Sequence, residues 1–141
     1  MGMELKLSAD ELAGYIDEIF PQVAGRFEIL DLEPRRIRVR MRANDSDLRP
    51  GGTVSGPSLF MLADCAFYMG LLAAIGRVPL AVTTNCAIDF MRKPAPGGLI
   101  AEARILKLGR TLAVGDVLIF SGGQPEPIAR AGLTYSIPKP E

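Results

Sequence analysis

The spacing of apolar residues changes along the chain, and its first two sections predict a helix and a hairpin. Between positions 8 and 20 the apolar residues lie three or four positions apart, as in a helix with one buried face. Ser8 and Glu11 have the spacing of a capping box at its start, and Pro21 ends it. Apolar residues then alternate with arginines, which predicts a half-exposed strand with residues 27–32 as its partner. These arginines are Arg36, Arg38, Arg40 and Arg42.

Residues 57–75 are unusually apolar and contain one charge, Asp64. Pro57 suits the first position of a helix, and Gly76 suits its end. A helix that is apolar all round is usually buried inside a domain, and a central carboxylate makes a membrane span costly. We therefore expect a buried helix wrapped by a sheet, and no membrane partner.

Four more strands are predicted after this helix, at residues 81–92, 99–106, 111–120 and 128–137. Each boundary contains glycine or proline, so we expect hairpins between successive strands. The order of elements predicts an α+β fold. The length of 141 residues suits one domain over residues 1–141, with residues 1–22 as an N-terminal helical addition.

The chain contains no histidine, which excludes Ser-His-Asp and Cys-His catalysis and histidine-based zinc sites. A general base must then be Asp, Glu, Lys, Tyr or Cys. Cys65 and Cys86 are too few for a structural zinc site or a disulfide framework, so we expect no metal and small core roles for both. The net charge is zero, so no nucleic-acid partner is expected, and the four arginines are interpreted as solvated protection of a sheet edge. The polar start of the chain does not resemble a signal peptide, so we expect a cytoplasmic protein.

Two features of the apolar helix could carry chemistry. Asp64 is the only charge between Arg49 and Arg77, and it is either a catalytic carboxylate or a buried aspartate bonded to backbone groups or to Tyr68. The N–H of Gly56 either stabilises a developing oxyanion or belongs to an ordinary Gly-Pro helix start. Eight residues of helix separate the two by about 12 Å. If both act on one carbonyl, they must therefore come from two subunits.

Four segments resemble a known family, the hotdog-fold thioesterases of the phenylacetate-degradation (PaaI-like) type. Residues 52–64, GTVSGPSLFMLAD, are similar to its G-T-x-H-G-G motif followed by an apolar helix with an aspartate. Residues 81–91, 93–97 and 109–111 resemble the strand that follows and two later turns. The resemblance implies a curved antiparallel sheet around a long central helix. It also implies edge-to-edge pairing of sheets in a homodimer or a dimer-of-dimers tetramer.

The same resemblance implies hydrolysis of acyl-CoA to a free carboxylic acid and coenzyme A. Asp64 would be the general base or nucleophile, Gly56 N–H would polarise the thioester carbonyl, and Thr83 would lie near the attacking water. Ser55 stands where the family has its histidine, and Arg49 or Asn44 could replace an upstream polar residue. Coenzyme A would enter only as part of the substrate, so no cofactor is expected. Its phosphates would contact Arg92, Lys93 and Arg110.

Two departures from the motif leave an alternative open. Ser55 replaces the family histidine, and Pro57 replaces the second glycine of its pair. A hotdog protein that binds acyl-CoA without hydrolysing it is therefore the second hypothesis. Hydratases of this fold use a histidine, which the chain does not contain.

Overall fold

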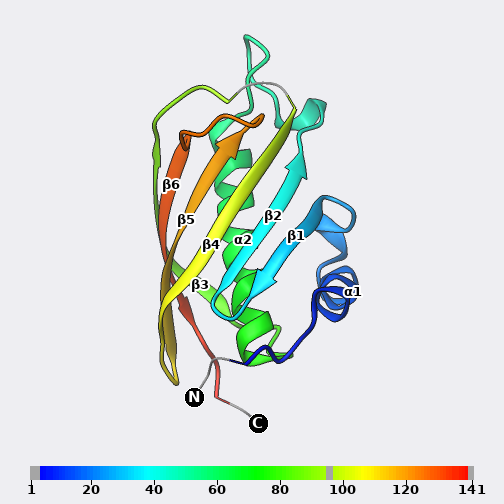
Figure 1. The fold of residues 1–141 in the computed structure, drawn as a ribbon, viewed down its shortest axis with the longest axis vertical. Helices are drawn as coiled ribbons and strands as arrows, with labels where there is room; N and C mark the ends of the chain where they lie inside the picture. Colours follow the sequence, from blue (N-terminus) through cyan, green and yellow to red (C-terminus); the bar gives the residue numbers. More distant parts are fainter. Residues whose placement is uncertain (1–3, 95–96, 140–141) are drawn as a thin grey trace.

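A computed structural model describes residues 4–94 and 97–139 of the chain. One long helix, α2, lies against the concave side of a curved antiparallel sheet, and a shorter helix, α1, lies beside it (Figure 1). The helices are α1 (Ala9–Ile19) and α2 (Gly56–Ile75), with short 3-10 turns η1 (Pro21–Val23) and η2 (Asp45–Asp47). The strands are β1 (Phe27–Glu33), β2 (Arg36–Arg42), β3 (Val82–Phe90), β4 (Gly98–Leu108), β5 (Leu112–Ser121) and β6 (Ala129–Ser136).

The start of α1 is fixed by the capping box expected from the sequence. The Ser8 hydroxyl accepts a hydrogen bond from the N–H of Glu11, and the Glu11 carboxylate accepts one from the N–H of Ser8. Leu12, Tyr15 and Ile16 form the buried face of the helix. This prediction is therefore confirmed to within one residue at either end.

Helix α2 is the buried core helix that its composition predicts. By length and composition it could cross a membrane, but 72% of the most apolar stretch of the helix is buried inside the protein. Gly76 ends the helix with a φ of 96°, a conformation that favours glycine. The sheet approaches α2 so closely that a Cβ at Gly115 would overlap the Phe67 ring and the carbonyl oxygen of Arg104. Only glycine fits there, because a larger residue would push the helix away from the sheet.

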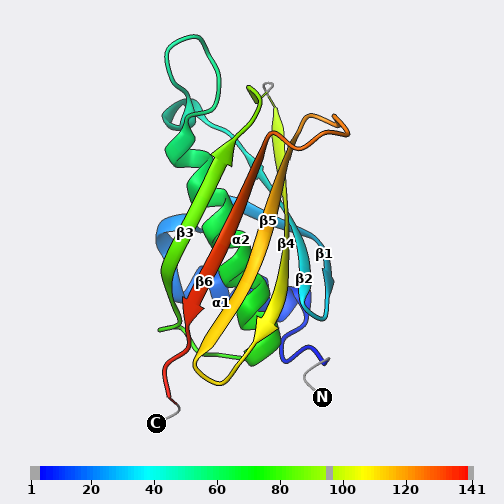
Figure 2. The same ribbon diagram turned by 90° about the vertical axis from the view of Figure 1, so that its left-hand side faces the viewer.

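The strands occur where predicted, but the expected hairpin between β3 and β4 is wrong. The order across the sheet is β1-β2-β4-β5-β6-β3, so β3 pairs with β6 and β4 pairs with β2 (Figure 2). After β2 the chain forms helix α2, and the next strand, β3, lies at the far edge of the sheet. The connection after β3 leads back across the sheet, so that β4 lies beside β2. Part of that connection, the turn predicted at residues 93–97, lies outside the described residues at positions 95 and 96. The consequence is that β3 forms one edge of the sheet.

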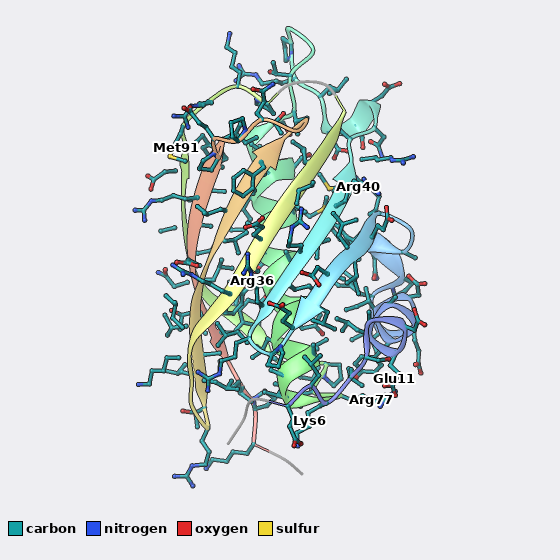
Figure 3. The ribbon with its side chains drawn as sticks, viewed as in Figure 1. Lys6, Glu11, Arg36, Arg40, Arg77 and Met91 are labelled. Carbon is teal, nitrogen blue, oxygen red and sulfur yellow. The ribbon has the colours of Figure 1, made fainter. Side chains whose placement is uncertain are left out.

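The arginines of β2 do not protect an edge, because β2 lies between β1 and β4. Arg36 and Arg40 lie on the face of the sheet turned away from α2 (Figure 3). Arg40 pairs with Glu28 of β1, at 2.8 Å, and Arg36 and Arg38 approach Glu102 of β4. The interpretation as edge protection is thus corrected: Arg36, Arg38 and Arg40 pair with carboxylates of the neighbouring strands.

Candidate active site

Asp64 lies in a pocket of about 420 Å³ rather than in a sealed interior. The pocket lies between the middle of α2, the segment entering β3, and the end of α1. Asp64 is half-buried and is the only carboxylate among the described residues that line it. The lining residues are Ile19, Phe20, Gln22, Asp64, Cys65, Tyr68, Pro79, Leu80, Ala81, Val82, Thr83 and Tyr135. The carboxylate therefore meets solvent inside a mostly apolar cavity.

Two hydroxyl groups hold the Asp64 carboxylate. The Oγ1 of Thr83 donates to Asp64 Oδ1 at 2.6 Å, and the Tyr135 hydroxyl donates to the same oxygen at 2.8 Å. The pairing with Tyr68 that the sequence left open does not occur, because the Tyr68 hydroxyl donates to the carbonyl of Pro79 at 2.8 Å. The structure thus brings together Asp64 and Thr83, which the sequence singled out, and adds Tyr135, which it did not.

The other titratable groups around Asp64 keep their protons. Burial raises the pKa of the Cys65 thiol to about 12, and the Asp64 charge adds to the shift. Burial also raises the pKa of Tyr68 to about 12. The pKa of Tyr135 is raised as well, first by burial and then by the neighbouring Asp64 charge. Asp64 is therefore the residue of this pocket best suited to accept a proton or to attack a carbonyl.

Gly56 lines a second pocket of about 490 Å³. Within one chain, Gly56 and Asp64 therefore line two different pockets. Gly56 is the first residue of α2, and its N–H has no acceptor among the described residues, as expected at a helix start. The Phe90 ring packs close to the backbone of Gly56, so that a Cβ added at Gly56 would lie 3.3 Å from Cζ of Phe90. Ser55 caps α2 by accepting the N–H of Ser58 at 3.4 Å.

Two of the three basic residues expected to bind coenzyme A line this second pocket. Arg92 and Lys93 lie beside Gly56, and Arg49 lies on the same pocket wall. Arg92 is held by the carbonyl of Pro127 at 2.6 Å and by a neighbouring glutamate. Arg110 is in the turn between β4 and β5, at the end of the molecule opposite the start of α2 (Figure 2). Within one chain it is thus separate from the other two.

A buried aspartate that the sequence did not single out braces the start of α2. The Asp47 carboxylate accepts hydrogen bonds from Nη2 of Arg26 at 2.6 Å, from the hydroxyl of Ser58 at 2.8 Å and from the N–H of Asn44 at 2.8 Å. The backbone carbonyl of Asp47 accepts the N–H of Ser55 at 2.7 Å. The turn carrying Gly56 is therefore tied to β1 through Arg26. The capping-box spacing of Asn44 and Asp47 was a signal for this turn, but nothing in the sequence indicated the ion pair.

Replacing Asp47 by alanine is expected to lower the free energy of unfolding by about 2 kcal/mol at pH 7, because Arg26 and Ser58 lose their acceptor. Burial opposes ionisation of Asp47, but its hydrogen bonds outweigh burial and lower its pKa below 3.8. The stabilisation by the ionised carboxylate is therefore present above pH 3.8 and is lost as the pH falls through the lower pKa of the folded protein. Urea unfolding at several pH values measures it, with the exposed Asp45→Ala in the same turn as control. An equal loss for both variants would contradict the bracing role.

No group of three or more Cys, Asp or Glu side chains suited to a metal ion occurs in residues 4–94 and 97–139. The candidate groups for chemistry are the Asp64 carboxylate, the two hydroxyls that donate to it, and the backbone N–H of Gly56. Such a set can transfer a proton from water and stabilise an oxyanion, provided that both parts meet at one substrate.

The sequence and the fold both match known proteins. Residues 51–128 match the family model described as Thioesterase superfamily. The crystal structure of a "putative thioesterase" from Silicibacter sp. TM1040 superposes with a TM-score of 0.91 at 55% identity, over 98% of this chain and 96% of that chain. A relative from Deinococcus radiodurans named "putative esterase" is 33% identical over 103 residues, which are 72% of this chain and 67% of the relative.

Two further solved structures have the same fold. A mutant of the phenylacetic acid degradation protein PaaI from Thermus thermophilus superposes with a TM-score of 0.72 at 27% identity, over 84% of this chain and 99% of that chain. The protein smu.793 from Streptococcus mutans, solved bound to acetyl CoA, superposes with a TM-score of 0.70 at 22% identity, over 80% of this chain and 89% of that chain. The resemblance inferred from residues 52–64 is confirmed, and the curved sheet around α2 is the hotdog fold. With a family match over more than half of its length, the chain belongs to the thioesterase superfamily.

Proposed function

We propose that the protein hydrolyses acyl-CoA thioesters as a homodimer or a dimer of dimers, with each active site shared between two subunits. The observation that carries this proposal is the Asp64 carboxylate, held by two hydroxyls in an apolar pocket that opens beside the edge strand β3. A pocket of this kind suits an acyl group, and the carboxylate suits activation of water at its carbonyl end.

The free edge of β3 supports pairing with a second copy. β3 pairs only with β6, so the other side of its backbone has no strand partner among the described residues. Leu80 and Val82 at the start of this edge are 76% and 55% exposed, and Phe90 and Met91 at its end are also exposed. An exposed apolar edge strand favours association, and a two-fold axis lets the same strand serve both subunits.

Such pairing explains how Gly56 and Asp64 can serve one substrate. Thr83, near the start of β3, donates to Asp64, while Phe90, at the end of β3, lies against Gly56. Antiparallel pairing of two β3 strands places the start of one beside the end of the other. Asp64 of one subunit then approaches Gly56 of the partner subunit, which agrees with the roughly 12 Å that separate them along one helix.

The hydrolysis follows from this arrangement. The thioester carbonyl accepts the N–H of Gly56 of the partner subunit, and water attacks the carbonyl carbon as Asp64 takes its proton. The tetrahedral intermediate then loses the coenzyme A thiolate, which takes up the proton, and the free acid remains. Alternatively, Asp64 attacks the carbonyl carbon, the C–S bond breaks, and the coenzyme A thiolate leaves an anhydride behind. Water then hydrolyses the anhydride to the free acid and Asp64, and the proton released from Asp64 is taken up by the thiolate. Both routes give the same products.

Coenzyme A would extend from the carbonyl along the subunit that supplies Gly56. Arg49, Arg92 and Lys93 line the pocket of that glycine, and their positive charges suit phosphate groups. The neighbour from Streptococcus mutans that was solved with acetyl CoA supports a ligand of this class. The antiparallel arrangement would also bring the β4–β5 turn of the subunit that supplies Asp64, with Arg110, towards this end of the groove.

A panel of acyl-CoA substrates tests the proposal. We expect the wild-type protein to release free thiol from aryl, short-chain or medium-chain acyl-CoA, because the pocket of about 420 Å³ is mostly apolar. Thiol release measured with a colorimetric reagent gives kcat and KM for each substrate. Absence of turnover across the whole panel would contradict hydrolysis.

A non-catalytic acyl-CoA-binding protein is the second candidate. The observation that favours it is Ser55, whose hydroxyl caps α2 where the resembling family has a histidine. Calorimetry with a non-hydrolysable acyl-CoA analogue, run beside the hydrolysis assay, separates the two candidates. Binding without turnover would support this alternative.

A further inference from the structure

The two hydrogen bonds to Asp64 are not shared evenly between its oxygens. Both Thr83 and Tyr135 donate to Oδ1, at 2.6 and 2.8 Å, and no described residue donates to Oδ2. Each hydroxyl has one proton to give, and an ionised carboxylate can only accept. The Tyr135 hydroxyl also lies 3.2 Å from the backbone carbonyl oxygen of Asp64, but its contact with Oδ1 is the shorter one. Oδ1 is therefore occupied by two donors, while Oδ2 has its lone pairs available to the pocket.

Tyr135 is held rigidly by the helix that carries Asp64. Its ring packs against Phe67, with ring centres 5.4 Å apart, and stacks on Tyr68 at 6.0 Å. Its backbone pairs directly with Thr83 across β3 and β6, so both donors come from adjacent positions of one strand pair. Only 3% of Tyr135 is exposed. The phenol is thus a donor whose direction is set by packing, and burial and the Asp64 charge raise its pKa so that it keeps its proton.

We propose that Tyr135 is a positioning residue of the active site, which with Thr83 fixes Oδ1 of Asp64 and leaves Oδ2 as the oxygen that reacts. Oδ2 would take the proton from water, or attack the thioester carbonyl. The proposal rests on the proposed hydrolysis, because it assigns a role in that reaction. A side chain held in one orientation by preorganised donors avoids reorientation during the chemical step.

Tyr135→Phe tests this role, because it keeps the ring packing and removes only the hydroxyl. We expect kcat for acyl-CoA hydrolysis to fall about 10- to 100-fold with KM changed less than about threefold, as for loss of one charge-assisted hydrogen bond. We also expect the acidic limb of the pH–kcat profile to move to higher pH, because the carboxylate loses a donor that favours its charged form. A merely structural role for the hydroxyl would leave that limb in place.

Tyr15→Phe is the matched control. Tyr15 is a buried tyrosine on α1, under Arg77, and does not line the Asp64 pocket. We expect this variant to keep the wild-type kcat and pH profile. Thr83→Val removes the other donor to Oδ1 and should move the acidic limb in the same direction, whereas Thr83→Ser should keep it near the wild-type position. If Tyr135→Phe does not fold, Thr83→Val and Thr83→Ser still test whether two donors on Oδ1 set the orientation of Asp64.

The outcomes separate the positioning role from the hydrolase function. If wild type hydrolyses acyl-CoA but Tyr135→Phe folds and keeps its kcat and acidic limb, the positioning role is overturned and the hydrolase function stands. An unmoved limb in Thr83→Val would overturn it equally. If the wild type itself shows no hydrolysis, the function fails and the role of Tyr135 fails with it.

Discussion

Replacing Asp64 by asparagine is expected to lower kcat for acyl-CoA hydrolysis by about 10²–10⁴-fold, the usual contribution of a general base. The amide oxygen of asparagine can still accept from Thr83 and Tyr135, so the local packing is retained. The amide cannot take a proton from water and is a poor nucleophile. The loss should therefore appear in kcat, with the fold and the proposed oligomeric state unchanged.

The control for this variant is Asp116→Asn. Asp116 lies on the outer face of β5 and pairs with Arg104, away from the pocket. We expect it to keep wild-type turnover. Thiol-release kinetics, circular dichroism and size-exclusion chromatography on both variants make the comparison. Wild-type turnover by a folded Asp64→Asn protein would end the assignment of Asp64 as the catalytic carboxylate.

Replacing Gly56 by proline is expected to lower kcat by about 10²–10³-fold, because proline has no N–H to give to the oxyanion. Gly56 is the first residue of α2, where proline is favoured, and Ser55 before it has the extended conformation that proline requires. The helix should thus keep its start. The effect isolates one backbone donor without changing any charge.

Gly56→Ala is the matched control, since it adds a Cβ towards the Phe90 ring but keeps the N–H. We expect its kcat to stay well above that of Gly56→Pro. Steady-state kinetics on the two variants, with melting temperatures to confirm folding, measure the difference. Equal kcat values in alanine and proline variants would show that the N–H is not the oxyanion donor.

The local elements could be predicted from the sequence because their signals are local. The capping box at Ser8 and Glu11 and the stop at Gly76 fixed helix ends to within one residue. The alternation around Ile37 and Val39 marked the strand face that packs on α2. Burial of α2 followed from its apolar composition on every face.

The order of the strands could not be predicted, because glycine and proline mark turns without telling which strands they join. The chain returns from β3 to β2 across the sheet, and this long-range pairing leaves β3 at the edge. Tyr135 was missed for the same reason. On its own strand it is one of several inward-facing apolar or aromatic residues, and only the pairing of β6 with β3 places it beside Thr83 and Asp64.

The ion pair of Arg26 and Asp47 also could not be predicted from the sequence. The two residues are 21 positions apart, and Asp47 stands among other polar residues of a loop. Its burial to 3% exposure results from the loop folding under the start of α2. Asp64, in contrast, was found because a single charge in an apolar helix stands out from its own neighbours.

Mixing subunits tests most directly whether two chains share each site. Asp64→Asn and Gly56→Pro subunits, each nearly inactive alone, are unfolded together, refolded and assayed for acyl-CoA hydrolysis. If the sites are shared, each mixed dimer contains one site with both native residues, and random pairing restores about a quarter of wild-type activity. Activity no higher than that of the two variants assayed separately, in a sample shown to contain mixed dimers, would contradict a shared site.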